Sequence, residues 1–174
     1  MKRILLVLVT VFFSLHLCSF AEKREVKRIE FISYVMSSLG VIDSKQAPGF
    51  YDLSENDPYY MYVASAREHG IITGYSGNIL KPYENITRED AIVILARAYE
   101  INPVSDIYIK DFGDFSKISE YSKGYISAAV QKKIIDYNKN ENFNPRGHID
   151  IDEMQKLCKN FDRYMKESMH FAFG

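Results

Sequence analysis

Two long stretches of this chain repeat each other, and this duplication limits the possible folds more than any single residue does. Residues 62–72 match residues 125–135, an offset of 125 − 62 = 63 residues. Nearly the same offset relates Pro82 to Pro145 and Phe50-Tyr51-Asp52 to Phe112-Gly113-Asp114. A repeat of this length predicts an array of similar structural units.

A short motif occurs three times, and each copy precedes an apolar helical pattern. The copies are Val26-Lys27-Arg28-Ile29-Glu30, Ile86-Thr87-Arg88-Glu89-Asp90 and Ile149-Asp150-Ile151-Asp152-Glu153. After each copy, apolar or small residues recur at i, i+3, i+4 and i+7, which is typical of one buried helix face. We therefore expect three motif helices that meet in one bundle.

The sequence also predicts where these helices begin and what lies between them. Thr87 and Asp150 are good N-cap residues, whereas Lys27 in the first copy is not, so that start is expected to be weaker by about 1 kcal/mol. Shorter helices are predicted over residues 57–69 and 119–132. Gly70 suits a left-handed end of the first, and Lys133 in the equivalent place predicts a strained ending.

Taken in order, these marks resemble S-layer homology repeats, whose signature is Ile-Thr-Arg-Ala-Glu. The second copy also has Phe50-x-Asp52, a Tyr-Val-x-x-Ala helix, Gly74-Tyr75 and a turn that ends at Pro82. The resemblance implies an all-α, pseudo-threefold bundle with shorter helix-loop prongs. It divides the chain into a partial repeat of residues 22–46, a repeat of residues 47–104, a degenerate repeat of residues 105–165 and a tail of residues 166–174.

Residues 1–21 have the character of a secretory signal peptide. Lys2 and Arg3 precede an uncharged run that ends in small residues, although a retained membrane anchor is the alternative. Without this segment, 22 − 2 = 20 basic residues face 23 acidic ones, a net charge of −3 that gives no overall attraction for nucleic acid. We expect a secreted protein located at the cell wall or cell surface.

The motif arginines are the residues with the clearest chemical potential. Arg28 and Arg88 fall in the first turn of their helices, where a guanidinium beside free amides and the positive end of the helix dipole suits a carboxylate or phosphate. S-layer homology domains look like wall anchors that grip a pyruvylated polysaccharide, so the resemblance implies that Arg28 and Arg88 contact the acid. It also implies that Thr87 positions the second arginine and that Gly74 and Tyr75 line a groove. Alternatively, the arginines only pair with Glu30, Glu89 or Asp90.

Several departures from the family pattern limit this expectation. The third motif has Ile151 in place of arginine, and Arg146 or His148 from the preceding loop are the candidate substitutes. Glu89 stands where alanine is usual and adds a negative charge beside Arg88, and the first repeat lacks its leading half. At most two grooves are therefore expected to bind an anion.

Catalysis, cofactors and metals are not expected. The histidines lack the spacing of metal ligands, and the alternating asparagines of residues 138–144 lack the acids of a calcium loop. Cys158 falls on an apolar helix stripe and is interpreted as a buried hydrophobic residue. The predicted function is noncovalent binding to an anionic cell-wall glycan. The alternative is an assembly module that self-associates or pairs with a protein partner, with little glycan affinity.

Overall fold

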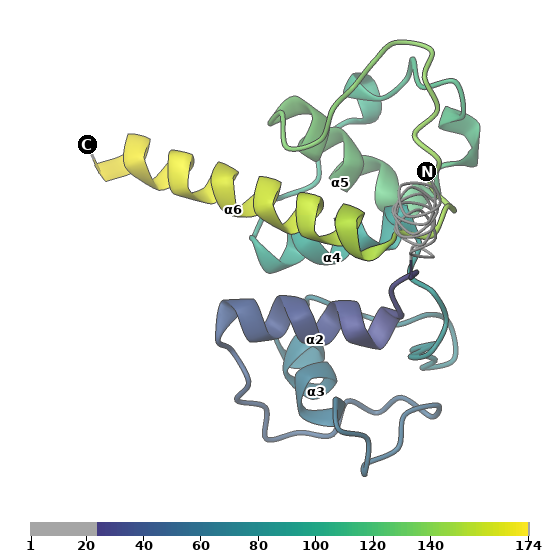
Figure 1. Ribbon diagram of the computed structural model, residues 1–174, viewed down its shortest axis with the longest axis vertical. Helices are drawn as coiled ribbons and strands as arrows, with labels where there is room; N and C mark the ends of the chain where they lie inside the picture. The colour runs from purple at the N-terminus through teal and green to yellow at the C-terminus, as the bar shows by residue number, and fades with distance from the viewer. Residues whose placement is uncertain (1–23, 174) are drawn as a thin grey trace, which may run out of the picture.

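The computed structural model describes residues 24–173, which form an all-α structure (Figure 1). The α-helices are α2 (Arg28–Leu39), α3 (Tyr60–Glu68), α4 (Arg88–Ala98), α5 (Glu120–Gln131) and α6 (Ile151–Phe173), with short 3-10 helices η1 (Asp106–Tyr108) and η2 (Phe115–Lys117). Extended segments of the described residues meet only in isolated β-bridges. The predicted all-α class is confirmed, while the predicted signal peptide, residues 1–21, lies outside the described residues.

The three motif helices α2, α4 and α6 each begin at the third residue of the motif, and the predicted caps are present. The Thr87 hydroxyl accepts a hydrogen bond from the Asp90 amide at 3.3 Å, and an Asp150 carboxylate oxygen accepts one from the Glu153 amide at 2.8 Å. Lys27 supplies no such cap. Instead the Glu30 carboxylate accepts from the Lys27 amide at 3.0 Å, so α2 has only half of the reciprocal pairing that stabilises a helix start.

A closed ring of backbone hydrogen bonds joins the three motifs just before their helices. Val26 donates to the Ile149 carbonyl at 3.0 Å, Ile149 donates to Ile86 at 3.3 Å, and Ile86 donates back to Val26 at 2.9 Å. All three residues are buried. The ring fixes the starts of α2, α4 and α6 around one point, although each segment lies about 60 residues from the next in the chain.

Helix α4 lies at the centre of the fold. It contacts α2, α5 and α6, whereas α3 packs on α2 and η1 packs on α5, an arrangement that can be followed in Figure 1. Every residue of α4 from Glu89 to Ala96 is buried. The core also includes Phe31, Ile126 and Phe161, each completely buried. Since burying one such side chain contributes about 1.5–3 kcal/mol, this common core explains why the repeats form a single bundle.

The two full repeats hold their long loops in the same way. Asp52 accepts hydrogen bonds from the amides of Leu80 and Lys81, and Asp114 accepts them from the amides of Phe143 and Asn144, all at 2.7 to 2.8 Å. These carboxylates turn each loop back toward the start of a motif helix. The strained ending predicted after the second short helix is also confirmed, because Lys133 has a positive φ of 56°.

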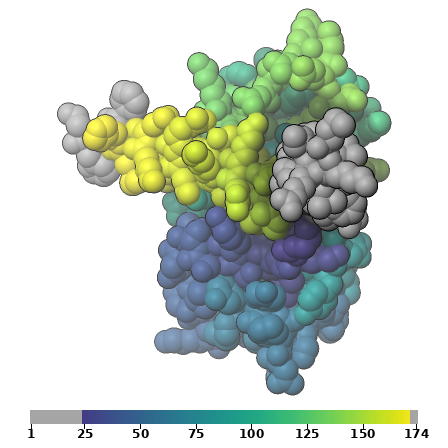
Figure 2. Space-filling view, in the orientation of Figure 1, coloured from purple at the N-terminus to yellow at the C-terminus, as the bar shows by residue number. Residues whose placement is uncertain are grey.

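Helix α6 is longer than the other motif helices and extends beyond the bundle (Figures 1 and 2). Cys158 is buried on its inner face, as expected, and burial raises the pKa of its thiol to about 12. The predicted tail continues this helix as far as Phe173, and Met169 on the projecting part is 52% exposed. Among the described residues, no helix has the length and apolar character needed to cross a membrane.

Candidate functional site

The Arg28 side chain is buried where the first turn of α2 meets the first turn of α4. Its Nη1 atom lies 3.1 Å from an Asp90 carboxylate oxygen, and the two side chains are only 7% and 8% exposed. The Nη1 contact with Asp90 is an ion pair without good hydrogen-bond geometry, and the buried Nε atom of Arg28 has no hydrogen-bond partner. The alternative that this arginine pairs with an internal acid is therefore confirmed for Arg28, but the pair leaves the Nε donor unsatisfied.

Two tyrosines complete the surroundings of Asp90. Tyr75 donates its hydroxyl hydrogen bond to one Asp90 oxygen at 2.6 Å, and Tyr121 from α5 donates to the other at 2.8 Å. Burial, followed by the hydrogen bond to Asp90 and its charge, raises the pKa of Tyr75 well above its usual value, although the Arg28 guanidinium lowers it in part. Burial and Asp90 also raise the pKa of Tyr121. Both hydroxyls therefore stay protonated and keep donating to Asp90.

These side chains line a cavity of about 300 Å³, which we call the first groove. Its polar lining residues are Arg28, Thr73, Tyr75, Ser76, Asp90, Arg97 and Tyr121, and Gly74 also lines it. Gly74 has a φ of +74°, and a Cβ atom there would lie 2.3 Å from Phe50 Cε1. Since no other residue fits this backbone and this contact, the close packing of Gly74 on Phe50 fixes the loop that forms one wall.

Thr87 lies next to this groove but does not line it. Together with Arg28, Tyr75, Lys81 and His148, it lines an adjacent cavity of about 420 Å³. The structure therefore places Arg28, Gly74 and Tyr75 in one groove, with Thr87 beyond the wall formed by Arg28 and Tyr75.

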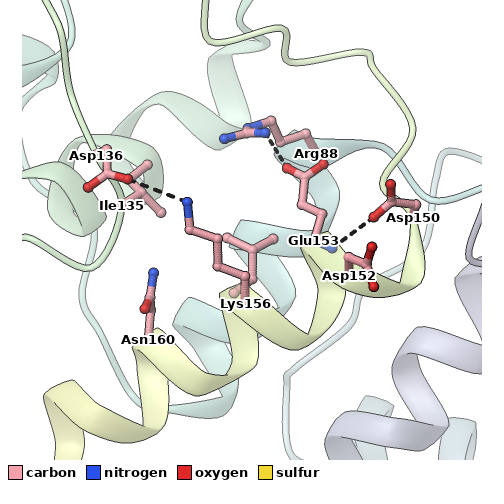
Figure 3. Close-up of a pocket in the computed structure, with 9 residues that line it drawn as sticks. Arg88, Ile135, Asp136, Asp150, Asp152, Glu153, Lys156 and Asn160 are labelled. Carbon is pink, nitrogen blue, oxygen red and sulfur yellow. Dashed lines mark hydrogen bonds and ion pairs between the residues drawn. The ribbon is translucent and has the colours of Figure 1, made fainter. Parts of the chain in front are cut away.

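Arg88 lies in a separate cavity of about 280 Å³, the second groove (Figure 3). Its guanidinium pairs with Glu153 on α6, and Lys156 lies 3.5 Å from Asp136. The ionisable lining residues are Arg88, Lys156, Asp136, Asp150, Asp152 and Glu153, so four acids face two bases. The second groove therefore carries a net negative charge, the opposite of what an anionic ligand requires.

A third groove, of about 360 Å³, lies between α2 and the start of α6. Ile151 occupies the position of the motif arginine, and Arg24 pairs with Glu30 at 2.9 Å. The expected substitutes for the missing arginine do not line this groove. His148 instead lines the cavity beside Arg28 and lies 3.3 Å from Glu25, because the bridge to Thr87 holds it there.

One part of the expected anion site is wrong, because the first-turn amides of α2 and α4 are not free. The amides of Arg28 and Ile29 donate to the carbonyls of Glu84 and Pro82 at 2.9 Å. The amides of Arg88 and Glu89 donate in the same way to Gly147 and Pro145. The long loops fill the helix ends, so a ligand meets side chains rather than backbone donors.

Glu89 has a different role from the one its sequence position suggested. Its buried carboxylate accepts hydrogen bonds from the Ser119 amide, the Ser119 hydroxyl and the Ser122 hydroxyl, at 2.8 to 2.9 Å. It therefore stabilises the N-terminus of α5, where a negative charge is favourable.

Sequence reasoning missed Asp90, Arg97 and Tyr121 as lining residues of the first groove. The sequence indicated Asp90 only as a possible partner of a motif arginine, Arg97 lies outside the motif, and Tyr121 lies more than 30 residues from it in the chain. Among the described residues, no group of three or more His, Cys, Asp or Glu could hold a metal ion.

The model of the S-layer homology domain family matches residues 49–92 and 111–153. These matches cover 44 + 43 = 87 of the 174 residues, and the chain belongs to this family. Domains of this family attach to the cell wall, and the chain is a secreted protein of the cell surface.

Known relatives contain a similar segment within much longer chains. The chain is 29% identical over 128 residues to an amylopullulanase of Thermoanaerobacterium thermosulfurigenes, covering 72% of this chain and 7% of that protein. It is 29% identical over 127 residues to the exoglucanase XynX of Acetivibrio thermocellus, covering 71% of this chain and 12% of that protein. It is 27% identical over 134 residues to a surface-layer 125 kDa protein of Lysinibacillus sphaericus, covering 75% of this chain and 11% of that protein. The shared segment is thus a small part of each of these proteins.

Proposed function

We propose that this chain binds an acidic, pyruvylated polysaccharide of the bacterial cell wall, and that the first groove is its main binding site. Arg28 is the principal contact to the acid, while Gly74 and Tyr75 shape the pocket for the sugar. Thr87 holds the second motif helix in place, and Arg88 in the second groove contributes less. This binding would attach the protein noncovalently to the cell surface.

The observation that carries this proposal is a buried motif arginine, Arg28, that lines the first groove and keeps its Nε donor unsatisfied. A buried donor without a partner costs about 1–3 kcal/mol, so a ligand acceptor that reaches this guanidinium, with a small shift of the side chain, recovers part of that cost. Asp90 already accepts from Tyr75 and Tyr121 and pairs with Arg28, and therefore keeps the guanidinium in place. A carboxylate that enters the groove forms charge-assisted hydrogen bonds, which are stronger than neutral ones.

The first groove is also the most complete of the three. It combines a motif arginine from α2, the Gly74-Tyr75 loop, the acid of α4 and an aromatic residue of α5. The second groove has Asp136 and Ile135 at the loop and no tyrosine in its lining, and the third has tyrosines but no motif arginine.

We further propose that the bundle is pseudo-threefold. The backbone ring of Val26, Ile86 and Ile149 supports this arrangement, because equivalent residues make equivalent bonds. The ion pairs support it as well. Arg28 pairs with the acid at the start of α4, and Arg88 pairs with the acid at the start of α6. Each repeat would then use the next one to orient its arginine.

Binding to purified cell walls, before and after chemical removal of the pyruvate, tests the function. We expect the protein to sediment with untreated walls, to be released as the salt concentration rises, and to bind at least about tenfold less after the pyruvate is removed. Equal binding to both wall preparations would contradict recognition of the acid.

The variant Arg28→Lys tests the site, with Arg88→Lys as its matched control. Lysine keeps the positive charge beside Asp90, so the protein is expected to fold, but it lacks the planar donor fork. We expect Arg28→Lys to lose about tenfold in wall binding and Arg88→Lys to lose less than about twofold. The reverse order would move the main site to the second groove.

A second candidate is an assembly module with little glycan affinity. The specific observation in its favour is that the second and third grooves lack parts that another subunit could supply. Sedimentation velocity in dilute solution separates the two functions. A monomer that binds walls supports anchoring, whereas a stable oligomer without wall affinity supports assembly.

A further inference from the structure

Arg97 lines the first groove at the end opposite Arg28. On α4, one helix face carries Asp90, Val93, Ile94 and Arg97, all of which line this cavity. Their spacing of i, i+3, i+4 and i+7 lays the groove along the helix, with Asp90 near its N-terminus and Arg97 in its last turn. Seven residues of helix span about 10 Å along its axis, so Asp90, which pairs with Arg28, and Arg97 belong to different ends of the groove.

The two arginines of this groove differ in how far their charge is neutralised. Arg28 is paired with Asp90. For Arg97, no carboxylate of the described residues lies within ion-pair distance, and its contacts are the hydroxyl of Tyr125 at 3.4 Å and the ring of the same residue at 5.3 Å. Of the ionisable residues that line this groove, Arg97 therefore supplies the net positive charge.

The equivalent positions in the other grooves carry no charge. An offset of 97 − 37 = 60 gives Ser37, which lines the third groove, and an offset of 160 − 97 = 63 gives Asn160, which lines the second. Asn160 donates a hydrogen bond to the Ile134 carbonyl at 2.9 Å and so has a structural contact of its own. Within the described residues, a cation at this position is thus found in the first groove alone.

We propose that Arg97 is a second anion contact, which binds another acidic group of the same glycan further along the groove from the acid bound at Arg28. This inference rests on the proposed function of the first groove and extends it. The groove then recognises a stretch of polymer with repeated acidic groups rather than a single acidic sugar. A guanidinium held against a tyrosine ring keeps its outer donors available for such a contact.

Arg97 also has a simpler structural role to separate from this one. A cation in the last turn of a helix interacts favourably with the helix dipole, so its loss could lower stability alone. The variant Arg97→Lys keeps the charge at that place but loses the planar fork. Arg163→Gln removes one positive charge from an exposed position of α6, outside the groove, and serves as the control for long-range electrostatics.

The test uses wall polysaccharide released from purified walls and separated into short fragments with one pyruvate group and longer fragments with several. Affinities are measured by calorimetry for the wild type and for Arg97→Gln, Arg97→Lys and Arg163→Gln, together with the melting temperature of each. We expect Arg97→Gln to bind short fragments as the wild type does, but to bind long fragments about fivefold more weakly. Arg97→Lys should keep part of the preference for long fragments, and Arg163→Gln should keep all of it.

Three results would overturn the inference. Arg97→Gln could bind long fragments as tightly as the wild type, or it could lose affinity for short and long fragments equally. Arg163→Gln could produce the same loss as Arg97→Gln, which would indicate a general effect of charge. In each case, a loss of binding in Arg28→Lys would leave the proposed function standing. If the wild type bound neither fragment, the proposed function would fail first and this inference with it.

Discussion

The first and second grooves occupy equivalent positions in two repeats, yet they differ in nearly every property that matters for an anion. In the first, a buried Arg28 pairs with Asp90, and Arg97 adds a positive charge. In the second, Arg88 is 35% exposed, pairs with Glu153 and is surrounded by further acids. A motif arginine is therefore not enough to define an anion site, because its neighbours decide whether its charge remains available.

The strongest way to break this comparison is to remove each arginine completely. Arg28→Ala leaves Asp90 buried without its cation, so we expect the free energy of unfolding to fall by about 3 kcal/mol. Arg88→Ala breaks a partly exposed pair and should cost about 1 kcal/mol or less. Urea denaturation, monitored by circular dichroism, measures the free energy of unfolding of both variants. Similar losses in the two variants would mean that the grooves are energetically equivalent.

Substitution of Gly74 tests the wall that distinguishes the first groove. An added Cβ would meet Phe50 and strain a backbone with positive φ, so Gly74→Ala should lower stability by about 2 kcal/mol and reduce wall binding. Gly77→Ala is the matched control, since Gly77 also has a positive φ but a Cβ there would meet nothing closer than 4.0 Å. We expect the control to lose about 1 kcal/mol. Thermal unfolding separates the clash from the backbone strain, and equal losses would exclude the clash.

The two tyrosines that bind Asp90 predict a pH effect. Their pKa values are raised in the folded protein, so the stability they contribute is fully present below the unfolded pKa of about 10 and is lost as the pH rises above it. We expect Tyr75→Phe and Tyr121→Phe each to cost about 1 kcal/mol at neutral pH and to flatten the loss of stability at alkaline pH. Melting temperatures between pH 8 and 11 measure this slope. Tyr51→Phe is the control, because Tyr51 is 82% exposed. It should leave the dependence of the melting temperature on pH unchanged.

The smallest expected effect comes from making the second groove resemble the first. Asp136→Asn and Glu153→Gln together remove two acids and release Lys156 and Arg88 from their pairs. In an Arg28→Lys background, where the first groove is weakened, we expect wall binding to rise about twofold to threefold, because exposed charges contribute little individually. Unchanged binding would show that the missing aromatic wall, rather than the acids, limits this groove.

Local patterns in the sequence predicted the helices well. Two motif helices, α4 and α6, begin at the positions that capping by Thr87 and Asp150 indicated, and the apolar stripes identified the buried faces. These features depend on residues within a few positions of one another. Such short-range chemistry can be read directly from the chain.

The composition of the grooves was harder to predict because each one is built from several repeats. The pairing of Arg28 with Asp90 and of Arg88 with Glu153 joins residues more than 60 positions apart. Asp52 and Asp114, which direct the loops whose carbonyls occupy the helix ends, also act on residues 28 and 29 positions away. A helix start considered alone has free amides, and only the folded loops reveal that they are already used.

The backbone ring of Val26, Ile86 and Ile149 has a mechanical consequence for a protein held at a surface. Each member both gives and receives one bond, so no motif can be pulled out without opening two of the three contacts. Tension applied at either end of the chain is thereby shared among the beginnings of α2, α4 and α6. The bundle should yield as one unit under load rather than unravel repeat by repeat.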